Sequence, residues 1–164
     1  MNKQELQNEI NKTKEHLAKM EKMLIECENE RWKPKKGQKY YYCTKEYQVL
    51  YLNWYDTKTD EELYSTYNCF QTREQAEAEA EKILVRRMLE DIARRLNKDN
   101  TICWRLTTNQ VKFYIFLGAG DELTFTSTYI NRAQGTIYCL DENFLDVAIS
   151  EIGEERLKKY LRGE

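Results

Sequence analysis

Few side chains of this sequence have the types and spacing that catalysis needs. His16 is the only histidine, and no Ser, Asp or second His can be placed beside it to form a triad or a metal site. Carboxylates are frequent, but those of residues 60–62 and 74–81 have the positions of loop and helix-start acids, without a second element that would oppose them across a cleft. We therefore expect no catalytic residues, no enzyme activity and no cofactor.

The glycines and cysteines also have structural interpretations. Gly118 and Gly120 lack the third Gly of a dinucleotide loop and the Gly-Lys-Ser/Thr of a Walker loop, so they predict a turn between two strands. The cysteines are odd in number and form no C-x-x-C pair. We expect no bound metal and five reduced, structural thiols, which are Cys27, Cys43, Cys69, Cys103 and Cys139.

Charge is close to balanced overall but is segregated along the chain. Lys and Arg total 26 against 28 Asp and Glu, which gives a net charge of -2 and excludes a global basic field. Basic residues predominate in 31–55, where they are mixed with aromatic residues that could stack on bases. The candidate nucleic-acid-binding residues are Arg31, Trp32, Lys33, Lys35, Lys36 and Lys39, with the arginines of residues 86–95 as a second basic set. Solvated lysines around a turn are the alternative.

Acidic residues predominate in 56–81 and are bordered by tyrosines. Carboxylates on such a surface could compete with phosphates for the basic groove of a nucleic-acid enzyme, and Tyr is a common anchor in protein interfaces. Ordinary loop and helix-start acidity is the alternative. The candidate partner-binding residues are Tyr55, Asp56, Asp60, Glu61, Glu62 and Tyr64.

A helix is expected over residues 1–30, which lack Gly and Pro. Its apolar positions alternate at spacings of three and four, and Thr13 and Cys27 extend the same heptad seam. The pattern favours a coiled-coil homodimer, with docking of the helix on its own chain as the alternative. The candidate oligomerisation residues are Leu6, Ile10, Leu17, Met20 and Leu24.

The rest of the chain predicts two units of strands followed by a helix. Pro34 ends the first helix. Strands are then expected at 40–44, 47–55 and 64–70, and Thr72 caps a helix that runs to about residue 96. The second unit has expected strands at 101–106, 110–117, 123–129 and 136–140, with Asp141 capping a helix over 142–162.

These elements predict an α+β fold with three segments: a helix at 1–30 and sheet-plus-helix units at 31–98 and 99–164 that pack as one globular domain. The repeated order of elements suggests a structural duplication. The start of the chain has no apolar region behind its charges, and no stretch approaches the length of a membrane span. We therefore expect a cytoplasmic protein that does not contact a membrane.

The segment 32–42, Trp-Lys-Pro-Lys-Lys-Gly-Gln-Lys-Tyr-Tyr-Tyr, together with residues 68–77 and 151–161, resembles small proteins of phages and prophages of Firmicutes, which often carry an N-terminal coiled coil. Residues 99–140 depart from that pattern. The resemblance implies a protein that acts on host machinery, and inhibitors of CRISPR and other defence systems are one class of these.

The leading expectation is therefore a non-enzymatic, phage-derived protein that binds and inhibits a host protein, most concretely a defence nuclease complex. A nucleic-acid-binding accessory protein that uses residues 31–42 is the first alternative. A structural phage protein assembled through the N-terminal helix is the second.

Overall fold

The computed structural model describes residues 12–17, 20, 31–98, 100–105, 109–129 and 131–164. The chain divides into two compact units, Met1–Lys35 and Lys36–Glu164. In the first unit, residues 12–17 are helical, and Leu17 and Met20 of the expected seam are exposed. Leu6, Ile10, Leu24 and Cys27 lie outside the described residues, so self-association through this helix stays a prediction.

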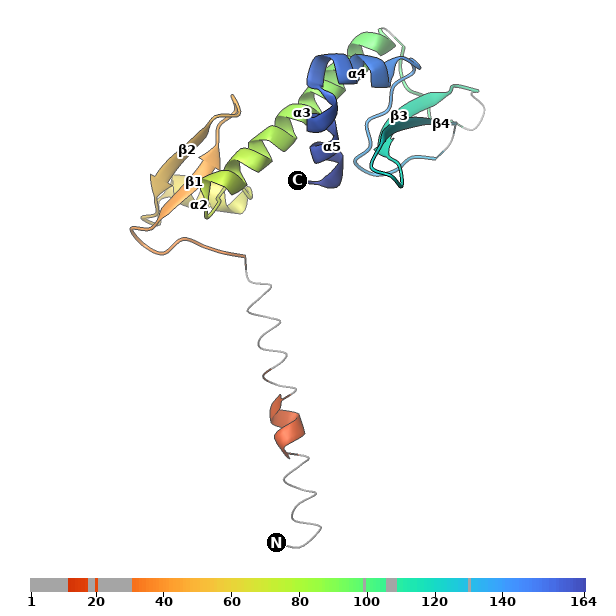
Figure 1. The fold of residues 1–164 in the computed structure, drawn as a ribbon. Helices are drawn as coiled ribbons and strands as arrows, with labels where there is room; N and C mark the ends of the chain where they lie inside the picture. The colour runs from red at the N-terminus through yellow and green to blue at the C-terminus, as the bar shows by residue number, and fades with distance from the viewer. Residues whose placement is uncertain (1–11, 18–19, 21–30, 99, 106–108, 130) are drawn as a thin grey trace, which may run out of the picture. The chain divides into compact units, whose positions relative to one another are not determined.

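The second unit begins with an antiparallel hairpin (Figure 1). Strand β1 (Lys39–Cys43) pairs with β2 (Val49–Asn53), and Tyr41 is opposite Tyr51. The prediction of strands in these two places is confirmed. On its other side β1 has only an isolated bridge, in which Tyr41 and Phe70 exchange both backbone hydrogen bonds at 2.9 Å.

The expected third strand at 64–70 is wrong. Helix α2 (Lys58–Ser65) occupies part of that range, and only Phe70 pairs with β1. Thr57 and Asp60 form a capping box, in which each side chain accepts a hydrogen bond from the backbone N–H of the other residue. This local signal starts a helix that runs to Ser65, despite the strand-forming residues that follow.

Helix α3 (Arg73–Asn97) matches the expected one closely. Thr72 is its N-cap, as predicted, and Gln75 completes a capping box by accepting from the backbone N–H of Thr72. At about 1.5 Å per residue the helix is roughly 37 Å long.

The second half contains two of the four expected strands. Strand β3 (Lys112–Leu117) pairs with β4 (Leu123–Thr128) through a turn at Gly118, as the glycines predicted. Residues 101–105 form no strand, and the expected strand at 136–140 is reduced to a bridge between Cys139 and Phe113.

The single helix expected over 142–162 is also wrong, because Gly153 interrupts it. Helix α4 (Phe144–Ile152) ends there and α5 (Glu154–Arg162) begins. Gly153 has φ 95° and ψ 141°, a conformation that only glycine adopts without strain. Asp141 is not the N-cap; its Oδ1 accepts from the backbone N–H of Asn143, and α4 starts after that residue.

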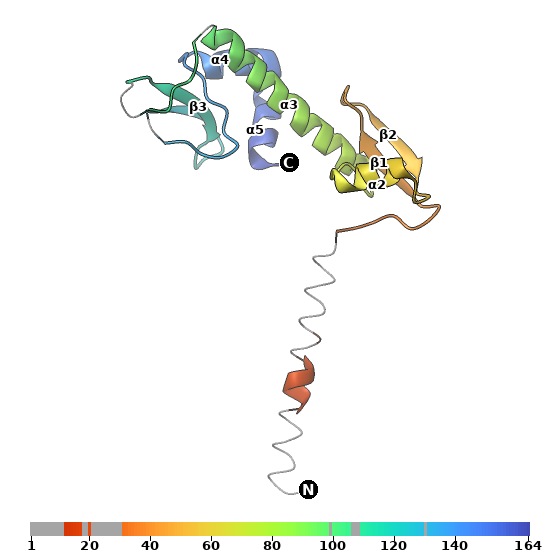
Figure 2. The ribbon, with the colours of Figure 1, turned by 180° about the vertical axis from the view of Figure 1, so that it is seen from behind.

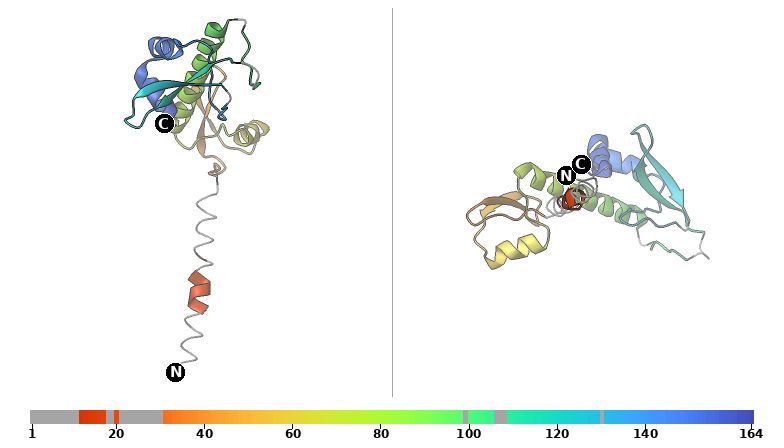
Figure 3. Two further views of the ribbon diagram at one scale, coloured as in Figure 1. Left: turned by 90° about the vertical axis from the view of Figure 1, so that its right-hand side faces the viewer. Right: turned by 90° about the horizontal axis from the view of Figure 1, so that it is seen from below.

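Helix α3 takes part in two apolar clusters. Figures 1 and 2 show it extending from the first hairpin to α4 and α5. Near its start, Ala76 and Ala80 pack with Cys43 of β1. Its second half packs with β3, α4 and α5 in the larger cluster, whose buried members are Val85, Leu89, Ile92, Ala93, Ile115, Cys139, Phe144, Ala148, Ile152 and Leu157. Figure 3 shows α3 running between the two hairpins.

The architecture is α+β, with two small antiparallel sheets and helices packed against them. In each half a hairpin and an isolated bridge to its first strand precede a helix, but in the first half α2 lies between the hairpin and the bridge. Among the described residues, no helix has both the length and the apolar content required to span a bilayer.

Replacing Gly153 with Ala should lower the free energy of unfolding by about 1–3 kcal/mol, because a Cβ is strained at this backbone conformation. Nothing lies within 4 Å of the added atom, so the loss would report conformation and not a clash. Urea unfolding measures it, with the exposed Ser150→Ala of α4 as the control. Equal stability of the two variants would contradict the assignment of strain to Gly153.

Candidate protein-binding surface on the first hairpin

Strand β2 and the residues after it carry large apolar side chains on the outside of the protein. Leu50, Tyr51, Leu52 and Tyr55 are 45%, 59%, 37% and 56% exposed. We call these four residues the β2 surface. Leu50 and Leu52 project from one face of the sheet and Tyr51 from the other, so the three side chains flank the outer edge of β2 on both faces. Single exposed apolar residues are common in proteins, but several along one strand edge are typical of an interaction site.

The outer edge of β2 is available for strand pairing. The backbone N–H and C=O groups of residues 48, 50, 52 and 54 point toward the first strand of the hairpin. The backbone hydrogen bonds from Thr44 to Gln48 and from Trp54 to Gln38 show this register. Because backbone groups alternate in direction along a strand, those of Val49, Tyr51 and Asn53 point away from β1. Within the described residues, β2 has no second strand neighbour.

A buried carboxylate fixes α2 to the hairpin beside the β2 surface. Asp60 is 2% exposed. Its Oδ2 accepts from the backbone N–H groups of Tyr55 and Thr57, both at 2.9 Å, and its Oδ1 accepts from the hydroxyl of Tyr40 at 2.8 Å. Three segments therefore meet at one side chain: β1, the end of β2 and the start of α2.

These hydrogen bonds change the acidity of both partners. Burial alone would raise the pKa of Asp60, but the bonds from Tyr55, Thr57 and Tyr40 outweigh it and lower the pKa to about 2. The pKa of Tyr40 rises well above its ordinary value, because the phenol is buried and donates to a carboxylate. The pair is therefore a phenol and a carboxylate anion at neutral pH.

Aromatic packing completes the junction. Trp54 is 1% exposed and makes edge-to-face contacts with Tyr40 and Tyr64, with ring centroids 5.8 and 6.1 Å apart. Its indole N–H donates to Asp56 at 2.6 Å. With Trp54 held inward, the next residue in the chain, Tyr55, is left exposed.

The predicted partner-binding residues therefore fall into two groups. Asp56, Glu61 and Glu62 are exposed, as is Tyr55, although Asp56 accepts from the Trp54 indole and Glu62 pairs with Lys58 at 3.6 Å. Asp60 does not belong to this exposed group, because its carboxylate is buried and fully engaged. Tyr64 is half-buried against Trp54, and this packing accounts for its position.

The predicted basic residues are divided between the two units. Lys36 and Lys39 lie in the second unit and are exposed, and the Lys39 ammonium lies 4.4 Å from the ring centroid of Tyr51. The remaining four belong to the first unit, where Lys33 and Lys35 are exposed and Arg31 and Trp32 are half-buried.

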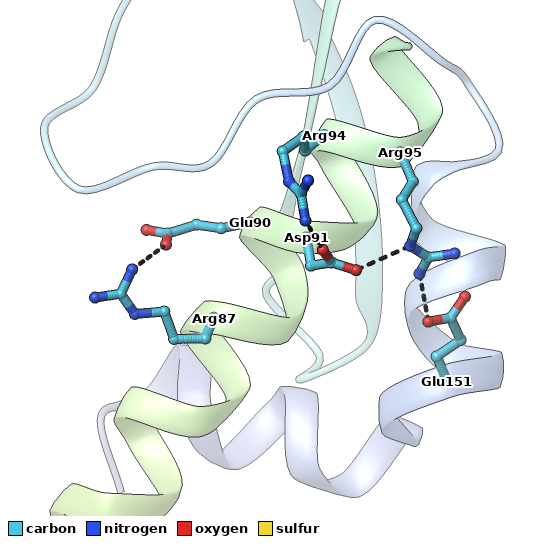
Figure 4. A network of polar contacts seen from close by, with 6 residues as sticks. All are labelled: Arg87, Glu90, Asp91, Arg94, Arg95 and Glu151. Carbon is cyan, nitrogen blue, oxygen red and sulfur yellow. Dashed lines mark hydrogen bonds and ion pairs between the residues drawn. The ribbon is translucent and has the colours of Figure 1, made fainter. Parts of the chain in front are cut away.

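Acidic neighbours offset the second basic set, on α3 (Figure 4). Glu90 pairs with Arg86 and Arg87. Asp91 pairs with Arg94 and Arg95, and Glu151 of α4 also pairs with Arg95. The carboxylates of α3 and α4 therefore partly neutralise these arginines, which are less available to bind phosphates than the sequence suggested.

The described thiols are in structural positions. None of the four described cysteines forms a disulfide. Cys43 and Cys139 are buried in the two clusters, and burial raises the pKa of each thiol, which keeps it protonated. In the part of the chain that the structure describes, no three His, Cys, Asp or Glu residues gather to hold a metal ion.

The sequence-based reasoning missed Leu50, Tyr51 and Leu52 as site residues. A signal was present: a strand with one face on a core alternates apolar and polar residues, whereas residues 49–52 are apolar without interruption. Such a run exceeds what a small half-buried hairpin can cover.

Loss of the Asp60 carboxylate should destabilise the protein in a pH-dependent way. Its folded pKa is depressed from 3.8 to about 2, so its contribution of about 2 kcal/mol is present above pH 4 and is lost as the pH falls toward 2. We expect Asp60→Asn to unfold at lower urea than the parent at pH 7, with a difference that shrinks below pH 4. The exposed neighbour gives the control Glu61→Gln. A difference as large at pH 2 as at pH 7 would contradict this account.

Comparison of the chain with protein-family models, with curated proteins and with solved structures gave no match. The resemblance of residues 32–42, 68–77 and 151–161 to phage proteins therefore remains a prediction.

Proposed function

We propose that this chain is a non-enzymatic binding protein that adds an extended segment of a partner protein to the outer edge of β2. The observation that carries the proposal is the exposure of Leu50, Tyr51 and Leu52 on a strand whose outer edge is unpaired within the described residues. Strand addition supplies affinity through main-chain hydrogen bonds and specificity through alternate side chains.

The composition of β2 supports this role. Natural proteins usually protect an edge strand with a charged residue, a proline or a bulge. Residues 49–53, Val-Leu-Tyr-Leu-Asn, contain neither a charge nor a proline, and they pair with β1 without a bulge. An edge that is left unprotected is suited to a partner.

The nature of the partner is the finer part of the proposal. Asp56, Glu61 and Glu62 are exposed around the start of α2, and Tyr55 is exposed as well. A basic surface, such as the nucleic-acid groove of a host defence nuclease, is complementary to these carboxylates. Inhibition of such a complex by a phage-derived protein is the most concrete form, and its phage origin rests on the sequence resemblance alone.

The Tyr51→Pro variant tests strand pairing directly. The N–H that it removes points outward, so the ladder between β1 and β2 keeps its bonds, and proline is tolerated on edge strands. Tyr51→Thr is the matched control, because it loses the same ring but keeps the N–H. The parent should capture a partner protein from host lysate. We expect this partner to bind Tyr51→Thr with an affinity close to that of the parent and Tyr51→Pro at least about tenfold more weakly.

A second variant, Leu50→Lys, adds a charge to the same edge and should have the same effect. The melting temperature of each variant, measured by thermal unfolding, checks that its fold is intact. A partner that binds Tyr51→Pro and Leu50→Lys as tightly as the parent would refute strand addition. Capture of no specific protein by the parent would refute the binding role.

Nucleic-acid binding is the second candidate function, favoured by the exposed Lys36 and Lys39 with Tyr51 beneath Lys39. This candidate predicts a gel shift whose affinity falls steeply with salt, and a Lys36→Gln/Lys39→Gln double variant should reduce the salt slope by about two. Absence of a shift at low salt would remove it.

A further inference from the structure

A pocket in the second half has no role in the binding surface described above. It has a volume of about 510 Å³, within the usual range for small-molecule sites. Its walls come from α3, β3, α5 and the segment 134–137, together with the first residue of α4. All of them belong to the unit Lys36–Glu164.

The floor of the pocket is apolar. Leu89, Ile115, Phe144 and Leu157 line it, and each of them is a buried member of the larger cluster. Ile137 and Leu161, which are half-buried, extend the same surface. Because Leu89, Ile115, Phe144 and Leu157 are already buried, an occupant gains mainly by burying its own apolar part and the remaining exposed surface of Ile137 and Leu161.

Cations predominate over anions at the rim. Lys82 and Arg86 line the pocket together with a single carboxylate, Glu79. Neither cation is paired with that carboxylate: the Lys82 ammonium donates to the carbonyl of Gly163 at 2.8 Å, and Arg86 pairs with Glu90.

Lys82 retains most of its capacity to bind an anion, and Arg86 retains part of it beside its ion pair with Glu90. An ammonium has three N–H donors, and the bond to Gly163 uses one of them. Glu90 is shared between Arg86 and Arg87, so one carboxylate serves two guanidinium groups (Figure 4 shows the contact with Arg87). Tyr160, Gln134 and Thr136 also line the pocket, so the lining includes residues with polar side-chain groups.

We propose that this pocket binds a small apolar molecule that ends in a carboxylate, such as a medium-chain fatty acid. The hydrocarbon lies on the floor formed by Leu89, Ile115 and Leu157, and the carboxylate meets Lys82 and Arg86 at the rim. The apolar floor accounts for the tail, and the excess of positive charge selects an anion over a neutral or cationic head group.

A head-group series tests the proposal. Decanoate, decanol and decylamine share one hydrocarbon tail, so calorimetric titration of the full chain with each separates the floor from the rim. We expect decanoate to bind about tenfold or more tightly than decanol, and decylamine to bind most weakly. Methyl NMR spectra should show shifts at Ile115, Ile137 and Leu157 but not at Leu50 and Leu52.

The variant Lys82→Met should lower the affinity for decanoate about tenfold and leave that for decanol unchanged. Lys159→Met is the matched control, because Lys159 is exposed on α5 and does not line this pocket. Equal affinities for the three head groups, or an unchanged decanoate affinity in Lys82→Met, would overturn the proposed anion selectivity. No methyl shift at about 1 mM decanoate would overturn the site itself.

Discussion

The buried carboxylate of Asp60 is the constraint on which the first half of the protein depends. A charge taken out of water is tolerated only when its hydrogen bonds are supplied, and here two backbone N–H groups and one phenol supply them. The geometry that satisfies this carboxylate also sets the orientation of α2 against the hairpin. It fixes Tyr55 at the surface, so the exposed and buried aromatic residues of this region have one common cause.

The elements that could be predicted from the sequence have strong local signals. Thr72 with Gln75 is a capping box, and the apolar spacing of α3 continues to its end. The glycines at 118 and 120 marked the turn between β3 and β4 correctly. Helix α2 was missed because residues 64–70 have high strand propensity, although Thr57 and Asp60 carry the start signal of a helix.

The apolar run at residues 49–52 marks β2 as unusual, but the sequence does not show locally whether its edge is exposed or covered. Residues 49–52 would be the interior of a larger sheet if residues 64–70 formed a strand beside them, and the composition is compatible with either arrangement. Phe70 pairs with β1 instead of β2, which leaves β2 at the margin. Likewise, the burial of Asp60 follows from the meeting of three segments, and residue type alone predicts an exposed acid.

Helix α3 has a consequence for how the second unit loses its structure. Ala76 and Ala80 anchor it to the first hairpin, whereas Val85, Leu89 and Ile92 anchor it to the second half. An interruption between these groups would leave a half-helix with a bare apolar stripe, which is costly in water. We therefore expect the two hairpins to melt cooperatively, and a molecule bound to either half to raise the melting temperature of both.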